Sequence, residues 1–154
     1  MDAVSAEYGC IERVEEILSG DMAGYSTFRN GDVIFAKISP CMENGKSAVV
    51  STDVEGVIFG STEFLVFRPS KDTILADYLH LLLRLKVLRE SAGRNMSGTT
   101  GHQRVTGSFF RDLKIPVPPL SVQKEIIAKV SAIYAEAKAM KSAAATELVA
   151  SKRK

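Results

Sequence analysis

The pattern of apolar and polar positions divides the chain into a β-rich part and a long helical end. Residues 33–38 form a nearly continuous apolar run after an Asn-Gly-Asp turn, as is typical of a buried strand. Pro40 ends this strand because proline lacks the ladder N–H, and an Asn-Gly turn then leads into a partner strand at residues 47–51. Further strands are predicted at residues 57–59 and 63–67.

A change of period predicts a helix after these strands. Between residues 77 and 91, leucines and a tyrosine recur at three- and four-residue spacing, which is typical of an amphipathic helix. The next segment, RNMSGTTGHQRVTG (residues 94–107), is polar, glycine-rich and without period. This segment is longer than most loops that only join two elements of a compact domain, so it is interpreted as functional or mobile. A short helical turn at 108–113 and a strand at 114–117 are expected to follow.

The last part of the chain predicts a single long helix. Between residues 120 and 152 there is neither Pro nor Gly, and Ala is abundant. Apolar and small residues step by three or four positions, as in a coiled-coil seam. The seam residues are Ile126, Val130, Ile133, Ala137, Met140, Ala144 and Leu148. A helix of some thirty residues is about 45 Å long, which exceeds the width of a small domain, so it is expected to protrude.

These elements predict a mixed α+β fold. A β-rich domain with short helices is expected at residues 1–118, followed by one long protruding coiled-coil-type helix at residues 119–154. A protruding helix with an apolar stripe needs another helix to cover it, within an oligomer or a larger assembly. The alternative is a helix that folds back on its own domain.

Composition indicates an ordinary globular protein. The chain has 154 residues, the size of one domain, and 45% of them are hydrophobic, which is enough to fill a core. Cys10 and Cys41 lack the spacing of a disulfide framework or a zinc site. The first residues have no basic, apolar leader, and no run is long enough to cross a membrane. The protein is therefore expected to be soluble, cytoplasmic and free of membrane and metal.

Charge is unevenly distributed along the chain. Residues 1–34 hold seven acidic and two basic residues, whereas residues 80–115 hold seven basic and two acidic residues. This asymmetry is compatible with a face that binds a polyanion. Ordinary solvated charge on helices and loops explains the same counts, so both interpretations stay open.

Catalytic motifs are absent from the sequence. There is no GxxxxGK[ST] phosphate loop, no GxGxxG and no Asn-Pro-Pro-aromatic tetrapeptide of amino-methyltransferases. Cys41 is a candidate nucleophile, which would make the protein a small hydrolase with His80 or His102 as base, but no pattern indicates an activated thiolate. A partly buried structural cysteine is the alternative, and His80 fits a helix face or core. Glu43 and Glu63 lie in separate loops.

Residues suited to binding are more numerous. They flank the loop at residues 35–46 or punctuate the glycine-rich segment, and they are Lys37, Lys46, Arg94, Asn95, His102, Gln103 and Arg104. Basic side chains position a protein on phosphates, and Asn, Gln and Arg read base edges. Glycines let backbone N–H groups approach a phosphate closely. Nucleic acid is one ligand that this mixture suits, and a protein-binding loop is the other.

Four blocks of sequence resemble a known family. They are FRNGDVIFAKISPCMENGK (28–46), FGSTEF (59–64), GHQRV (101–105) and LKIPVPPLSVQKEI (113–126). In this order they resemble a target-recognition domain and its trailing helix from the specificity subunit of type I restriction-modification systems. The IPVPPLSVQ block, at the start of the long helix, is the most distinctive of them.

The resemblance implies a non-enzymatic protein that reads double-stranded DNA. Family members carry two recognition domains separated by two long helices that pack antiparallel, so that each domain reads one half of a split site. Methyltransferase subunits dock on this framework and methylate adenine, and a separate motor-nuclease subunit cuts. The specificity subunit itself binds no cofactor, because S-adenosylmethionine is bound by the methyltransferase.

The matched blocks also suggest individual residues. The candidate DNA contacts in them are Lys37, Asn44, Lys46, Thr62, Glu63, His102, Gln103 and Arg104. Pro40, Cys41 and Gly45 are expected to shape the loop instead. Motifs shared by proteins that read different DNA sequences are equally explained by fold support or backbone contact. Base reading is therefore expected from the less family-typical residues Arg94, Asn95 and Ser97.

The chain departs from the family pattern in two ways. It has one recognition domain and one long helix where the family usually has two of each, and it begins where a family domain is already under way. It is therefore interpreted as a half-size or truncated member that pairs with a second copy, or as a fragment. A two-fold pair restores two domains and an antiparallel helix pair. The alternative function is a degenerate half-subunit that dimerises or assembles without useful DNA binding.

Overall fold

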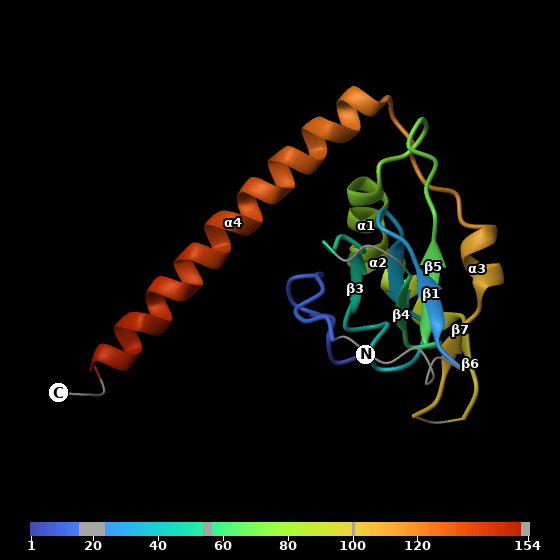
Figure 1. The fold of residues 1–154 in the computed structure, drawn as a ribbon, viewed down its shortest axis with the longest axis horizontal. Coiled ribbons are helices and arrows are strands. Elements are labelled where there is room, and N and C mark those ends of the chain that lie inside the picture. Colours follow the sequence, from blue (N-terminus) through green and yellow to red (C-terminus); the bar gives the residue numbers. More distant parts are fainter. Residues whose placement is uncertain (16–23, 54–56, 100, 152–154) are drawn as a thin grey trace.

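The computed structural model describes residues 1–15, 24–53, 57–99 and 101–151. Small antiparallel sheets and short helices form the body, and one long helix follows them, so the predicted mixed α+β class is confirmed. Figure 1 shows the helix leaving the body diagonally, with the C-terminal end far from the sheets.

A three-stranded antiparallel sheet forms the centre of the body. Strand β2 (Val33–Ala36) lies between β3 (Ser47–Val49) and β5 (Phe64–Phe67), so the predicted pairing across the loop at residues 35–46 is confirmed. All four β2 residues are buried. Burial on both faces explains why this strand has a continuous apolar run rather than an alternating one.

Strand β2 separates two layers of the hydrophobic core. Val33 and Phe35 pack on one side with apolar residues of the helices. Ile34 and Ala36 pack on the other side with a cluster that includes Phe28. Successive side chains of a strand point to opposite faces, so one four-residue strand contributes to both layers.

A second, two-stranded sheet belongs to the latter layer. Strands β1 (Ser26–Phe28) and β4 (Ile58–Gly60) pair antiparallel. The Phe28 ring meets Phe64 edge-on, with 6.3 Å between ring centroids. A Cβ on Gly60 would lie 2.3 Å from the Phe28 ring, so this approach requires glycine.

The predicted single helix at residues 77–91 is wrong, because the structure has two. Helix α1 (Ala76–Arg84) and helix α2 (Lys86–Arg94) are separated by Leu85, which has extended backbone angles of φ −55° and ψ 131°. Arg89 Nε donates to the carbonyl of Arg84, the last residue of α1, at 3.1 Å. This carbonyl has no hydrogen-bond partner within α1 because the helix ends there. The residues of α2 that join the core are Leu88 and Ala92.

The glycine-rich segment contains a small hairpin rather than an irregular loop alone. Strands β6 (Met96–Ser97) and β7 (Arg104–Val105) pair antiparallel. Two-residue strands are too short to produce a visible period, which is why the pattern gave no sign of them. In Figure 1 this hairpin lies at the end of the body away from the start of the long helix.

The chain then crosses the body before the long helix. Helix α3 (Gly107–Arg111) agrees with the expected helical turn, and its Phe110 ring packs edge-on against Phe35 and Phe67 at 5.5 and 5.3 Å. The strand predicted at residues 114–117 is wrong, because this segment is neither strand nor helix. Prolines within and after it lack the N–H that a ladder needs.

Helix α4 (Leu120–Ser151) confirms the predicted long helix. Its first turn is fixed to the body by Gln123, whose side chain is fully buried. Gln123 Oε1 accepts from the N–H of Leu75 at 2.9 Å, while Nε2 donates to the carbonyls of Thr73 and Pro118 at 2.9 and 2.8 Å. All these contacts are to backbone groups, so Gln123 works as a structural anchor.

Beyond this anchor, α4 is largely exposed. Of the seam residues, Ile133 and Met140 are 65% and 64% exposed. A neighbouring stripe faces the N-terminal segment instead: Lys138 Nζ lies 5.2 Å from the Tyr8 ring centroid, and Lys141 forms an ion pair with Glu7. Among the described residues, no helix has the length and hydropathy of a membrane span.

Candidate nucleic-acid interface

Three segments that are distant in the sequence meet beside the β6–β7 hairpin. The N–H of Lys37 donates to the carbonyl of Glu63, and the N–H of Val105 donates to the carbonyl of Lys37, both at 2.9 Å. The N–H of Ser39 donates to the carbonyl of Gln103 at 2.9 Å. Backbone hydrogen bonds therefore join the end of β2, the turn before β5 and the hairpin into one surface. Its residues, called the hairpin site below, are Lys37, Thr62, Glu63, Ser97, His102, Gln103 and Arg104.

A bidentate ion pair between Arg104 and Glu63 lies in the middle of the hairpin site. Arg104 Nε donates to Glu63 Oε2 at 2.9 Å, and Arg104 Nη2 donates to Glu63 Oε1 at 2.6 Å. Arg104 Nη1 donates to the carbonyl of His102 at 2.9 Å. The guanidinium is thus held in a fixed plane by a carboxylate and by its own hairpin.

The charges of this pair shift both pKa values. The hydrogen bond from Arg104 is the main cause that lowers the pKa of Glu63; burial opposes it, and the positive fields of Lys37 and His102 add to the lowering. The hydrogen bond to Glu63 raises the pKa of Arg104. Both groups are therefore charged at neutral pH.

The hairpin presents polar side chains to solvent. Ser97 lies opposite Arg104 in the ladder, and Ser97, His102 and Gln103 are all exposed. Gly98 has a φ of +122°, and a Cβ there would lie 2.8 Å from the carbonyl oxygen of His102. The tight return of the chain therefore requires glycine at this position.

Arg94 and Asn95 lie immediately before the hairpin, where α2 ends. Both are exposed, and Asn95 Nδ2 donates to the carbonyl of Ser91 at 2.8 Å. Asn95 therefore closes the last turn of α2 while its side chain stays accessible. The structure thus places these candidate base readers next to the hairpin in the chain, and their role stays a prediction.

Asn44 and Lys46 have different surroundings. Lys46 Nζ donates to the carbonyl of Met1 at 3.3 Å and lies 4.0 Å from the Asp2 carboxylate. Asn44 is exposed in the loop before Gly45, outside the hydrogen bonds that build the hairpin site. The structure therefore does not join these two candidates to the hairpin site, and their contact with DNA stays a prediction.

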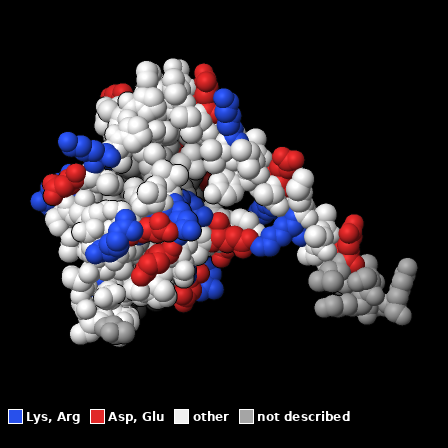
Figure 2. Space-filling view, turned by 180° about the vertical axis from the view of Figure 1, so that it is seen from behind, with Lys and Arg blue, Asp and Glu red and all other residues white. Residues whose placement is uncertain are grey.

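Several arginines of the basic region have structural partners that the sequence did not reveal. Arg84 donates to the carbonyls of Gly45, Ala6 and Glu7 at 2.8, 3.1 and 2.9 Å. Arg89 donates to the carbonyl of Glu43. On the face shown in Figure 2, basic and acidic side chains lie side by side rather than in a patch of one sign. The count of seven basic residues therefore overstates the number of basic side chains that are free to contact a polyanion.

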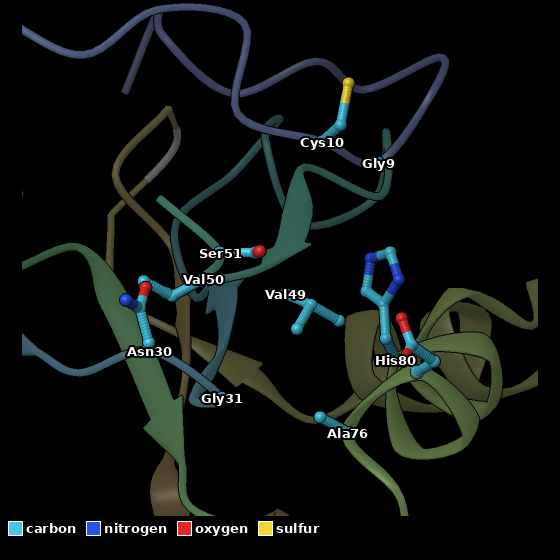
Figure 3. A pocket seen from close by; sticks show the side chains of 10 residues that line it. Gly9, Cys10, Asn30, Gly31, Val49, Val50, Ser51, Ala76 and His80 are labelled. Atoms are coloured by element: carbon cyan, nitrogen blue, oxygen red, sulfur yellow. The ribbon is translucent and has the colours of Figure 1, made fainter. Parts of the chain in front are cut away.

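The residues considered for catalysis do not form a reaction centre. His80 Nε2 lies 3.0 Å from Ser47 Oγ, and burial lowers the pKa of His80 to about 4. His80 and Cys10 both line an open cavity of about 460 Å³. Figure 3 shows the Cys10 sulfur directed away from the His80 ring. Cys41 packs against the β1–β4 layer of the core and does not line this cavity. Within the described ranges, no three His, Cys, Asp or Glu residues gather as metal ligands.

The fold and the hairpin site together define a class of protein in which a small β-rich body with a polar surface is joined to a projecting helix. Comparison with known families agrees with this class. The family model "Type I restriction modification DNA specificity domain" matches residues 16–147. The chain belongs to this family, which is a family of specificity domains and not of catalytic ones.

Individual relatives are specificity subunits. The chain is 42% identical over 104 residues to the type I restriction enzyme EcoAI specificity subunit of Escherichia coli, covering 68% of this chain and 18% of the relative. It is 32% identical over 117 residues to the putative MjaX specificity subunit of Methanocaldococcus jannaschii, covering 73% and 26% of the two chains. The chain therefore spans about a fifth to a quarter of these relatives.

Solved structures show the same fold. The HsdS subunit from Thermoanaerobacter tengcongensis superposes with a TM-score of 0.76 at 28% identity, covering 90% of this chain and 35% of that one. A chain from a study of complex assembly and conformational transition in a type I restriction-modification system gives 0.73 at 30% identity, covering 91% and 36%. Both likenesses include most of the described elements of this chain.

Proposed function

We propose that this chain reads one half of a bipartite recognition site in double-stranded DNA. The observation that carries the proposal is the hairpin site, where backbone hydrogen bonds from three segments hold Lys37, Gln103 and Arg104 on one surface of a specificity domain. Amide, guanidinium and ammonium groups are the side chains that contact phosphates and base edges. Arg94, Asn95 and Ser97, beside or within the hairpin, are proposed to read bases.

The long helix has a separate task in this proposal. The body at residues 1–118 recognises DNA, and the helix at 119–154 holds the body at a fixed distance from a second recognition domain. Its exposed seam, with Ile133 and Met140 in the middle, suits a partner helix. A second copy of the chain, packed antiparallel, is the proposed partner. Methyltransferase subunits that use S-adenosylmethionine, and a motor-nuclease subunit, are proposed to dock on that framework.

Titration of duplex DNA at several salt concentrations tests the recognition role. Binding by the wild-type chain is expected to weaken steeply with salt, because each phosphate contact releases condensed counterions. Lys37→Ala is expected to reduce affinity and to lower the salt slope by about one, since it removes one phosphate contact. Lys71→Ala removes the same charge from an exposed turn outside the hairpin site and serves as the matched control. Equal affinities for Lys37→Ala and wild type would remove Lys37 from the interface.

One observation favours a second function. Arg84 and Arg89 donate to backbone carbonyls and Arg104 pairs with the Glu63 carboxylate, which reduces the free donors that these arginines offer to DNA. The second candidate is therefore an assembly module that pairs through α4 and docks methyltransferase without useful DNA binding. A chain that self-associates yet shows no salt-dependent binding to any duplex would favour this second function.

A further inference from the structure

We propose that Lys37, His102 and Arg104 form an oxyanion site that the Glu63 carboxylate occupies in the free chain, and that a DNA phosphate enters this site by displacing Glu63. This inference rests on the proposed function and adds a means of discrimination to it. Glu63 would then act as an internal competitor that weakens binding to DNA without the correct sequence.

The geometry of the ion pair is that of an occupied anion site. Arg104 offers Nε and Nη2 to the two oxygens of one carboxylate, at 2.9 and 2.6 Å. This paired arrangement fits two oxygens of a phosphate equally well. Lys37 and His102 stand close enough to add positive fields at the Glu63 carboxylate. Lys37 and His102 are joined to this pair through their backbones, because the Lys37 N–H donates to the Glu63 carbonyl and the His102 carbonyl accepts from Arg104. A bidentate anion donor beside positive groups is therefore occupied by a side chain of the protein.

The partial exposure of Arg104 and Glu63 allows a phosphate to replace the Glu63 carboxylate. The Arg104 and Glu63 side chains are 41% and 26% exposed, so the pair lies at the surface and not in the core. Ion pairs at such places contribute little net stability, because water competes for both partners. A duplex brings many phosphates and releases counterions on contact, which is a larger effect. A polyanion can therefore replace Glu63 where a single small anion would compete poorly.

The backbone of Glu63 is held independently of its carboxylate. Its carbonyl accepts from the N–H of Lys37 at 2.9 Å, and its own N–H donates to Ser61 Oγ at 3.1 Å. The side chain is thus free to leave Arg104 while the turn stays in place. For the same reason, Glu63→Gln is expected to keep the fold and to remove only the negative charge.

Displacement of Glu63 by a phosphate would affect how the chain discriminates between DNA sequences. While Glu63 pairs with Arg104, the two charges largely cancel for a distant phosphate, so Arg104 adds little to non-specific attraction. Only a duplex that fits the rest of the surface brings a phosphate close enough to displace the carboxylate. A repulsive group next to an attractive one is a recognised way to gain discrimination.

The test measures binding of wild type, Glu63→Gln, Arg104→Gln and the double variant to a duplex of random sequence across salt. Glu63→Gln is expected to bind several-fold more tightly, with a salt slope steeper by about 0.9, because Arg104 gains one phosphate. Arg104→Gln is expected to weaken binding, because it leaves the Glu63 carboxylate unpaired, and to abolish the gain in the Glu63→Gln background. An unchanged slope in Glu63→Gln, or a gain that survives Arg104→Gln, would overturn the inference.

Retention on a heparin column separates this inference from the proposed function. Heparin is a polyanion without bases, so the oxyanion site predicts that Glu63→Gln elutes at higher salt than wild type and that the double variant does not. Later elution without duplex binding by any variant would keep the oxyanion site and overturn the DNA-reading role. Unchanged elution alongside salt-dependent duplex binding would keep the DNA-reading role and overturn the oxyanion site. Melting temperatures of all four proteins check that each is folded.

Discussion

At the scale of single residues, His80 shows how burial lowers the pKa of a side chain. Ser47 is fully buried, and its hydroxyl donates to the carbonyl of Gly45 at 3.1 Å, which leaves its oxygen to accept from His80 Nε2 at 3.0 Å. Burial is the main cause that lowers the pKa of His80 to about 4, and the positive charge of Arg84 adds to it. The ring is therefore neutral at neutral pH, and its Nε2 is bound to Ser47.

This lowered pKa predicts a loss of stability in mild acid. The unfolded chain takes up a proton near the ordinary histidine pKa of about 6.5, whereas the folded chain takes it up only near 4. The contribution of neutral His80 to the free energy of unfolding is present above about pH 6.5. It is lost as the pH falls toward 4, by an amount on the order of 3 kcal/mol at most. Urea unfolding between pH 4.5 and 7.5 measures the dependence.

Replacement of either histidine distinguishes the cause of this dependence. His80→Gln keeps a donor for Ser47 and is expected to flatten the profile. His102→Gln removes the other histidine, at an exposed hairpin position, and serves as the matched control. A slope of the same size in His80→Gln would assign the effect to another group.

At the scale of elements, Arg84 links three parts of the fold. From the last turn of α1, its guanidinium donates to Gly45 in the loop before β3 and to Ala6 and Glu7 in the N-terminal segment. A Cβ on Gly9 would lie 2.7 Å from this guanidinium, so the segment also fits closely around it. The N-terminal segment in turn meets α4 through Glu7 and Tyr8.

Removal of this guanidinium is expected to loosen both segments together. In Arg84→Gln, three carbonyls lose a charged donor, and amides at residues 5–9 and 41–46 are expected to exchange hydrogen at least tenfold faster. Hydrogen exchange with mass spectrometry measures the change. Lys86→Gln removes a positive charge two residues away, where Lys86 pairs with exposed Glu90, and is the control. Unchanged protection in both segments would contradict the structural role of Arg84.

At the scale of the whole molecule, the projecting helix determines what the chain can assemble with. The first turn of α4 is fixed to the body by buried Gln123, and a later stripe meets the N-terminal segment through Lys138 and Lys141, while the seam residues Ile133 and Met140 are exposed. An apolar stripe on an isolated helix gains little stability by itself, so a covering helix is expected to contribute most of it. Pairing between two copies is the simplest closed arrangement.

A charge placed in the seam tests this pairing. Ile133→Glu is expected to convert a dimer into a monomer, because pairing would bury a carboxylate without a partner. Light scattering on a size-exclusion column measures the mass. Ala135→Glu adds the same charge on another face of the helix, at an exposed position, and is expected to stay dimeric. A monomeric wild-type chain would contradict pairing between copies and leave a methyltransferase subunit as the expected partner of α4.

The sequence by itself determined the central strands, the long helix and the family, and only the tertiary structure decided which groups the charged residues contact. Local period was enough for β2, β3 and α4, because apolar spacing and proline-free runs act within a few residues. It was not enough for the break at Leu85 or the hairpin at β6 and β7, which depend on packing and on very short strands.

Roles in the candidate site depended on contacts between distant residues. Glu63 and Arg104 are 41 positions apart, and nothing local in either motif indicates that they pair. Gln123 and Arg84 likewise bind backbone groups that folding alone brings near them. The sequence therefore named the residues of the hairpin site. Tertiary structure showed that its central arginine is already paired, because a guanidinium binds whichever oxygen atoms the fold places beside it.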